Sequence, residues 1–114
     1  MSIRVQVSAS GDDTVVALSG SGNTAVLVHL ADGVGAIARS TRGRVFVDVG
    51  GVELLGAEPE ADGLGAFVDR LLIVADGRSA LVASPGDRHD LLVRAGIAQR
   101  IPVHRSAPPG AAPR

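Results

Sequence analysis

The chain has 114 residues, 46% of them hydrophobic, which is enough for one domain with one core and too short for two. A net charge of −1 with no basic stripe gives non-specific nucleic-acid binding little electrostatic support, and the absence of cysteine excludes disulfides and thiolate metal sites. No apolar run approaches the roughly 20 residues of a membrane-spanning helix, and the start of the chain is too polar for a signal peptide, so we expect a cytoplasmic protein without membrane insertion.

The chain opens with a predicted β-hairpin. Residues 3–9 alternate apolar and polar, the pattern of a half-buried strand whose inward residues would be Ile3, Val5 and Val7. The turn signal at residues 11–13 predicts that residues 14–19 return as the hairpin partner.

A helix follows over about residues 24–40, with Asn23 as its N-cap. Gly33 and Gly35 weaken this helix by roughly 1 kcal/mol each relative to alanine where they are exposed, and close packing on a sheet is the simplest explanation for both. The apolar residues of its inward face are Leu27, Leu30, Val34 and Ile37.

Residues 45–49 form a strand that is apolar on both faces, which places it in the centre of a sheet. A polar loop of about a dozen residues separates it from a second helix, which starts at Asp62-Gly63 and has apolar residues at spacings of three and four. Those residues are Leu64, Phe67, Val68, Leu71, Leu72 and Ala75. We expect the function to lie where this strand is followed by this helix, because such loops expose backbone N–H groups at the rim of a rigid scaffold.

The last third of the chain predicts a short buried strand at residues 79–83, a third helix that starts within 84–87 and is closed by Gly96, and an edge strand at 101–104. The composition from residue 106 onward is that of a disordered tail.

The domain organisation is therefore one domain over residues 1–105 and a disordered tail over residues 106–114. The order β-β-α-β-α-β-α-β predicts an α/β fold, with a mostly parallel sheet of four to five strands and helices packed on it.

This order resembles a STAS domain, a family that includes the antagonists of anti-sigma factors. Residues 47–55 (VDVGGVELL) run towards residues 62–65 (DGLG), where family members carry Val-Asp-Leu-Ser-Gly-Val, then Asp-Ser-Ser-Gly-Leu-Gly, then a helix. Residues 86–101 are similar to the last helix of the family and its closing Leu-x-x-x-Gly-Leu segment. The resemblance covers roughly residues 4–105.

The main departure from the family lies at the phosphorylated residue, a serine or threonine just before Gly-Leu-Gly. Aligned on that motif, Asp62 stands at the phosphoacceptor position, and the loop carries about four extra residues at 56–59. Aligned without a gap from Leu55, the positions of Ala61 and Asp62 become Ala57 and Glu58. Neither alignment supplies a hydroxyl, since residues 53–78 contain no Ser, Thr or Tyr.

The resemblance also implies which residues contact a partner, namely Asn23, Glu60, Ala61, Asp62, Gly63, Leu64 and Gly65. The implied partner is an anti-sigma factor of the serine-kinase type, or another protein subunit. The early family motif Leu-x-Gly-Glu-Leu-Asp reads LSGSGN at residues 18–23, so the acidic pair of the family is missing there.

Two roles are open for Asp62, and they can coexist: a fixed mimic of the phosphorylated state, or the N-cap of the second helix. The acidic residues of the preceding loop favour a solvated or partner-facing surface over a metal or acid–base site, because no other residues complete a ligand set.

Ile73 lies towards the outer flank of the second helix, where it indicates either a docking surface or a second packing contact. The three histidines, His29, His89 and His104, lie on different elements without metal-ligand spacing.

We therefore expect no enzyme, no metal and no cofactor. The predicted function is a protein-interaction module, an anti-sigma factor antagonist-like regulator of transcription that lacks the usual phosphorylatable serine. The alternative is a non-phosphorylated STAS subunit of a transporter or signalling scaffold. The oligomeric state is not predicted.

Overall fold

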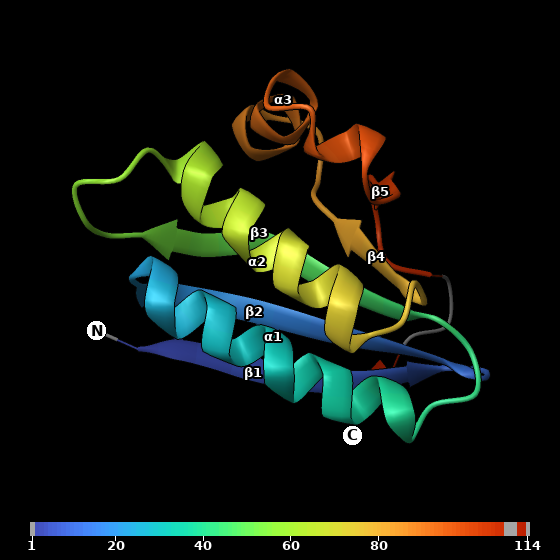
Figure 1. The fold of residues 1–114 in the computed structure, drawn as a ribbon. Coiled ribbons are helices and arrows are strands. Elements are labelled where there is room, and N and C mark those ends of the chain that lie inside the picture. The colour runs from blue at the N-terminus through green and yellow to red at the C-terminus, as the bar shows by residue number, and fades with distance from the viewer. Residues whose placement is uncertain (1, 109–111, 114) are drawn as a thin grey trace.

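The structure is a computed structural model that describes residues 2–108 and 112–113, with side chains described up to residue 108. It is a two-layer α/β domain in which α1, α2 and α3 cover one face of a twisted sheet (Figure 1). The elements are β1 (Ile3–Ser10), β2 (Asp13–Gly22), α1 (Thr24–Arg39), β3 (Val45–Leu54), α2 (Glu60–Val74), β4 (Ser79–Val82), α3 (Asp87–Arg94), the 3₁₀ turn η1 (Ile97–Gln99), β5 (Val103–His104) and β6 (Ala112–Pro113).

The sheet has the strand order β5-β4-β3-β2-β1-β6. The pairs β2–β3, β3–β4 and β4–β5 are parallel, whereas β1 runs antiparallel to both of its neighbours. The predicted α/β fold, its element order and its mostly parallel sheet are confirmed. The central position predicted for the strand at residues 45–49 is confirmed too, because β3 lies between two parallel partners.

The main core lies between the sheet and the three helices. It is built from valine, leucine, isoleucine and alanine around one aromatic ring, that of Phe67, which is fully buried. Phe46 is on the opposite face of the sheet, where it packs with Val15, Ala80 and Val82. The strand β3 therefore buries apolar side chains on both faces, as its composition predicted.

A bulge lengthens β3 beyond its predicted end. Between the pairs Ala17–Asp48 and Ser19–Gly51, two residues of β3 lie opposite one residue of β2. The Asp48 carboxylate accepts a hydrogen bond from the Gly50 N–H at 2.9 Å, which holds the bulge. Because one residue is added, Val52 points to the helix side again, although the alternation of the earlier valines would have turned it away.

The predicted loop of about a dozen residues is therefore wrong. The strand continues to Leu54 and α2 begins at Glu60, which leaves a five-residue connection over residues 55–59. The sequence pattern missed the extension because the strand alternation changes phase at Gly50-Gly51.

The start of α1 is as predicted, since the Asn23 side chain accepts a hydrogen bond from the Val26 N–H at 2.9 Å. The two glycines of this helix differ in their surroundings. A Cβ on Gly35 would lie 2.7 Å from the Cβ of Val74 on α2, whereas a Cβ on Gly33 would meet nothing within 4 Å. Close packing thus explains Gly35 only, and the neighbour is a helix rather than the sheet.

The end of α1 is tied to the segment before β4 by Arg78. Its guanidinium donates hydrogen bonds to the carbonyl oxygens of Ala38, Thr41 and Gly43, at 2.6 Å for Thr41 and 3.2 Å for Gly43. A cation here gives the carbonyls at and just after the end of α1 a shared donor and complements the helix dipole.

The face of the sheet opposite the helices is partly covered by the chain that follows β5. Ala107 packs on the apolar cluster around Phe46, and Ala112–Pro113 pair antiparallel with Ser8 and Ala9 of β1. The sequence predicted a disordered tail from residue 106, and the structure differs at these two points because the edge of β1 offers unpaired backbone groups. Residues 109–111 and 114 lie outside the described residues.

The inward face predicted for β1 is only partly buried. Ile3 packs against the core and Val7 is half-buried, but Val5 is 47% exposed. The reason is that the main contacts of α1 with the sheet are with β2 and β3, so the helix side of β1 is covered less.

Candidate functional site

The sequence-predicted site lies at the edge of the sheet where the parallel strands β2 and β3 end. The Leu55 N–H donates to the Gly22 carbonyl at 2.9 Å, which holds the two strand ends together. α1 starts directly after β2, and α2 starts after the short connection that follows β3. The structure thus brings the first turns of both helices to one edge (Figure 1).

Gly63 shows how close the two helix starts are. A Cβ on this residue would lie 2.8 Å from Thr24 Oγ1 and 2.9 Å from Leu54 Cδ1. Any side chain here would separate the first turns of α1 and α2, so the glycine lets the helices converge at this edge.

The first turn of α2 begins at Pro59 and not at Asp62. Both the Asp62 and Gly63 N–H groups donate to the Pro59 carbonyl, and no side-chain hydrogen bond caps the helix. The role of Asp62 as N-cap is therefore wrong, because Pro59, with φ of −58°, starts the helix three residues earlier. Glu60 and Asp62 instead place two carboxylates in the first turn, where the helix dipole favours negative charge.

The residues predicted to contact a partner differ in exposure. Glu60, Asp62 and Asn23 are exposed, and Ala61 and Gly65 are half-buried. The side chain of Leu64 is fully buried in the main core. Gly63 is buried as well, so the two residues support the site from within and a partner meets the residues around them.

Sequence reasoning did not single out Arg88, which comes from α3. Its guanidinium donates to the Val52 carbonyl at the end of β3, and it lies 3.7 Å from Glu60 Oε1. The side chain is only 15% exposed, and one of its terminal nitrogens is buried without a partner among the described residues. Arg88 is one of eleven arginines in the chain and lies on a short polar helix, so no sequence pattern distinguished it from the others.

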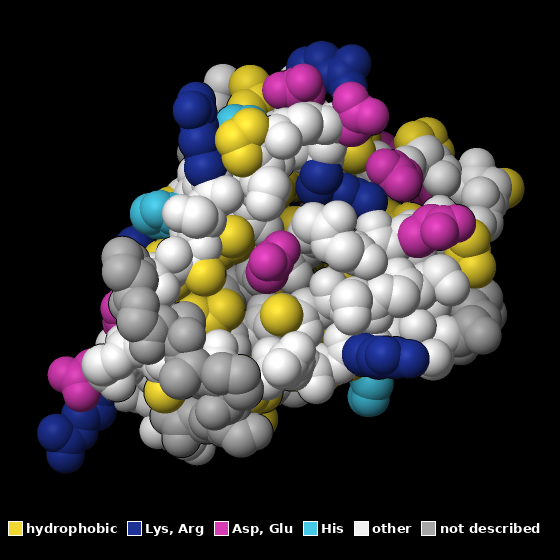
Figure 2. All heavy atoms as spheres, turned by 180° about the vertical axis from the view of Figure 1, so that it is seen from behind, with side chains coloured by type: hydrophobic (Ala, Val, Ile, Leu, Met, Phe, Trp, Pro, Cys, Tyr) yellow, Lys and Arg dark blue, Asp and Glu magenta, His cyan; other side chains and the backbone are white. Residues whose placement is uncertain are grey.

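Beside Arg88 a hollow of about 560 Å³ opens between α3 and the bulge of β3. Its lining carries charges of both signs, from Glu60, Asp87, Arg88 and Arg94. Figure 2 shows this side of the molecule, with acidic and basic side chains interleaved above an apolar area of the sheet. Mixed charges of this kind suit the polar rim of a protein interface.

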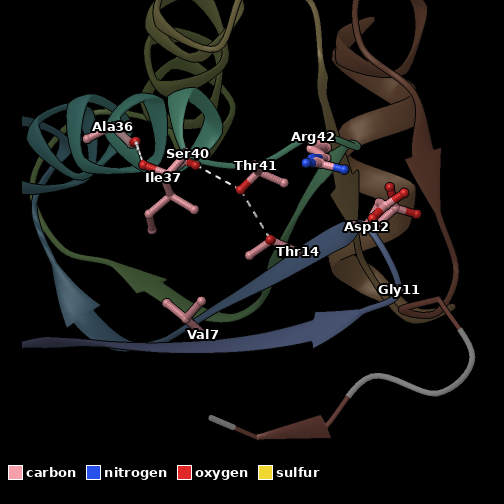
Figure 3. A pocket seen from close by; sticks show the side chains of 10 residues that line it. Val7, Gly11, Asp12, Thr14, Ala36, Ile37, Ser40, Thr41 and Arg42 are labelled. Atoms are coloured by element: carbon pink, nitrogen blue, oxygen red, sulfur yellow. Dashed lines mark hydrogen bonds between the residues drawn. The ribbon is translucent and has the colours of Figure 1, made fainter.

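A second hollow, of about 500 Å³, lies at the opposite end of the sheet (Figure 3). It separates the turn of the β1–β2 hairpin from the end of α1, with Val7 and Ile37 as its apolar walls. The hydroxyls of Thr14 and Thr41 lie 3.3 Å apart on one side. No histidine is among the described residues that line this hollow, and one of its two aspartates, Asp13, accepts a hydrogen bond from the Arg44 N–H at 2.8 Å.

Ile73 lies on the outer side of α2 and is 72% exposed, so in the described part of the chain it is a surface residue without a second helix over it. His29 is exposed on α1, and His104 on β5 packs edge-on against Phe46 with ring centroids 5.3 Å apart.

Over the described residues, no three His, Asp or Glu side chains are grouped to hold a metal ion. None of the helices described here has the length and apolar character needed to cross a bilayer.

Comparison with known proteins adds a likeness of fold. No family model matches the sequence, and no curated protein matches it either. Among solved structures, an anti-sigma factor antagonist from Mycobacterium paratuberculosis is similar, with a TM-score of 0.68 over 92% of this chain and 87% of that one. The sequence identity is 20%, so the match establishes the fold. The chain has the fold of that antagonist, and the STAS-like fold predicted from its sequence is confirmed.

Proposed function

We propose that this protein is a non-catalytic interaction module of the anti-sigma factor antagonist type, acting in the cytoplasm. One observation carries the proposal. The first turn of α2 presents the carboxylates of Glu60 and Asp62 to solvent at the edge where both helix starts meet. The fold shared with an antagonist supports this use of the edge, since function in such folds resides in loops on a rigid scaffold.

The mechanism follows from charge at the start of α2. In the family that the sequence resembles, a phosphate on serine at this position breaks docking by like-charge repulsion and desolvation. Asp62 stands at that position here, and its carboxylate carries about −1 charge against roughly −1.5 to −2 for a phosphoserine. The negative charge is therefore permanent and smaller, and no hydroxyl between residues 53 and 78 is present to add to it.

Arg88 gives this surface a second component. It joins α3 to the end of β3 and to Glu60, so the charge next to Asp62 is partly balanced by a nearly buried cation. A partner that approaches α2 would thus meet Asp62 as the unpaired carboxylate of the first turn, because Glu60 already faces Arg88.

The proposal is tested by removing the charge of Asp62 and restoring the hydroxyl. The protein and its Asp62→Ser variant are each used to recover partners from the native cell, and affinity is then measured with the purified partner. We expect an anti-sigma factor of the kinase type to bind Asp62→Ser at least about tenfold more tightly, because a like-charge repulsion is removed. With ATP, that partner should phosphorylate residue 62 of the variant and leave the natural chain unmodified between residues 53 and 78, as read by mass spectrometry.

The matched control is Asp90→Ser, which removes an exposed carboxylate from the first turn of α3 and should leave the affinity unchanged. Recovery of an ATPase or scaffold subunit that binds both variants equally would replace this proposal with the alternative, a STAS subunit that never meets a kinase. Phosphate found within residues 53–78 of the natural chain would overturn the alignment and the mechanism together.

A further inference from the structure

The outer edge of β1 is the least protected part of the sheet. On its inner side β1 pairs with β2 along its whole length, from Ile3 to Ser10, without a bulge. On its outer side, Ser8 and Ala9 pair with the two residues of β6. In the part of the chain that the structure describes, no strand pairs with residues 3–7 on that side.

The backbone groups that face outward can be assigned from one hydrogen bond. The Ser21 N–H donates to the Ser2 carbonyl, and the register of the hairpin is constant from there on. Because hydrogen-bonded and non-hydrogen-bonded pairs alternate in an antiparallel ladder, Arg4 and Gln6 direct their backbone groups to β2. Ile3, Val5 and Val7 therefore direct their N–H and C=O groups outward.

The side chains of the same three residues lie on the helix side of the sheet, where Ile3 and Val7 are partly buried and Val5 is largely uncovered. Val5 is 47% exposed there, and Val26 of α1 is 40% exposed nearby, since both Ile3 and Val26 approach Gly22. Val7 continues this apolar strip into the hollow below α1 (Figure 3). The edge thus combines backbone groups that pair with no described strand and an apolar face that is only partly covered.

Monomeric proteins protect such edges with lysine, proline, a bulge or an inward charge, because a long flat edge is a template for another strand. Residues 3–7 (IRVQV) contain none of these devices apart from Arg4, which points to the other face. The same edge already pairs with an antiparallel strand at Ser8 and Ala9, where β6 lies beside it.

We propose that two copies of the protein pair through this edge, β1 against β1 in antiparallel orientation, with the two-fold axis at Val5. In this register Val5 lies opposite Val5 of the second copy, and Ile3 lies opposite Val7. Each of these pairs exchanges two backbone hydrogen bonds, because their N–H and C=O groups all face outward. The apolar strips of the two copies become continuous across the axis.

The register is selected by charge and by space. A two-fold axis at Arg4 would place two arginines directly opposite each other, which is unfavourable. An axis at Gln6 would place Arg4 opposite Ser8, whose outer side is already taken by Pro113. With the axis at Val5, Arg4 lies opposite the neutral Gln6. The start of α2 stays open in this dimer, so the inference and the proposed function succeed or fail separately.

The first test is a pair of matched charge substitutions. Sedimentation velocity of the natural chain should show a reversible dimer as the concentration rises towards about 1 mM. Val5→Glu places two like charges at the axis, and the dissociation constant should rise at least about tenfold. Val93→Glu, on a valine that is 52% exposed on α3, should leave the dimer unchanged. Because both valines are exposed, both variants should fold, and circular dichroism checks this.

The second test uses the absence of cysteine in the chain. Opposed residues in a hydrogen-bonded antiparallel pair have Cα atoms about 5.5 Å apart, which is within disulfide reach. Val5→Cys should therefore form a covalent dimer on mild oxidation, whereas Arg4→Cys and Val93→Cys should not. The inference is refuted if the natural chain stays monomeric, if Val5→Glu leaves the dimer intact, or if Val5→Cys cross-links no faster than Val93→Cys.

Discussion

The contact between α1 and α2 at Gly35 makes a quantitative prediction. The Cβ of an alanine at this position would lie 2.7 Å from Val74 Cβ, 2.8 Å from Val74 Cγ2 and 3.0 Å from the Val74 carbonyl oxygen. Two of these atoms belong to a β-branched side chain that turns little in a helix, and the third is backbone, so the helices must move apart.

The expected size follows from two opposing terms. Replacing glycine by alanine inside a helix gains roughly 0.5–1 kcal/mol of intrinsic stability. Overpacking at a close contact costs typically about 1–3 kcal/mol. Gly35→Ala should therefore lower the free energy of unfolding by about 1–2 kcal/mol, which is a fall in Tm of roughly 4–10 °C.

Gly33→Ala is the matched control, because this glycine is in the same helix and is exposed with nothing within 4 Å of a new Cβ. It should raise the free energy of unfolding by about 0.5–1 kcal/mol. Urea unfolding followed by circular dichroism gives both values, since the chain has no tryptophan or tyrosine to report by fluorescence.

Adding Val74→Ala to Gly35→Ala removes the contact with Cγ2 and gives the remaining Cβ room to move, so the double-mutant cycle should show a favourable coupling of at least about 0.5 kcal/mol. If Gly35→Ala were as stable as Gly33→Ala, the close approach of α1 and α2 at this point would be disproved.

Two further predictions concern the ends of α1. Asn23→Ala should lower the free energy of unfolding in urea by about 1 kcal/mol through loss of the N-cap, and Asn23→Ser should recover most of this loss. Equal losses in the two variants would show that the cap contributes nothing. Arg78→Ala should lower the free energy of unfolding by about 2–4 kcal/mol, because the carbonyls of Ala38, Thr41 and Gly43 lose a shared donor. Arg78→Lys should recover only part of this loss, because an ammonium lacks the planar fork of the guanidinium. Full recovery by lysine would contradict this reasoning.

The sequence predicted the fold well where local signals were strong. The apolar run of residues 45–49, the hairpin turn and the Asn23 cap each depend on residues close together in the chain, and each is present in the structure. The burial of Val5 was overestimated, because alternation shows which face a side chain points to but not whether a helix covers that face.

The sequence predicted the start of α2 only approximately, and partner binding at that place stays a prediction. The second helix was expected to start at Asp62-Gly63, with N-cap as one of two roles for Asp62, because Pro59 was taken as part of the loop; the helix begins earlier, with Pro59 as its N-cap. Arg88 joins the site through a contact with Val52, 36 residues away in the chain. No local pattern reports such a contact, since it depends on how α3 is placed against the end of β3.

The bulge in β3 also determines where this chain can change in length. The extra residue at Gly50-Gly51 shifts the phase of the strand, so removing one glycine would turn Val52 and Leu54 away from the helices. The cost is about 1.5–3 kcal/mol for the buried Val52 and less for the partly buried Leu54. Residues 55–59, by contrast, are all exposed, so insertions and deletions there leave the strand phase intact. Relatives of this protein should therefore vary in length between Leu55 and Pro59 and keep a constant number of residues between Asp48 and Leu54.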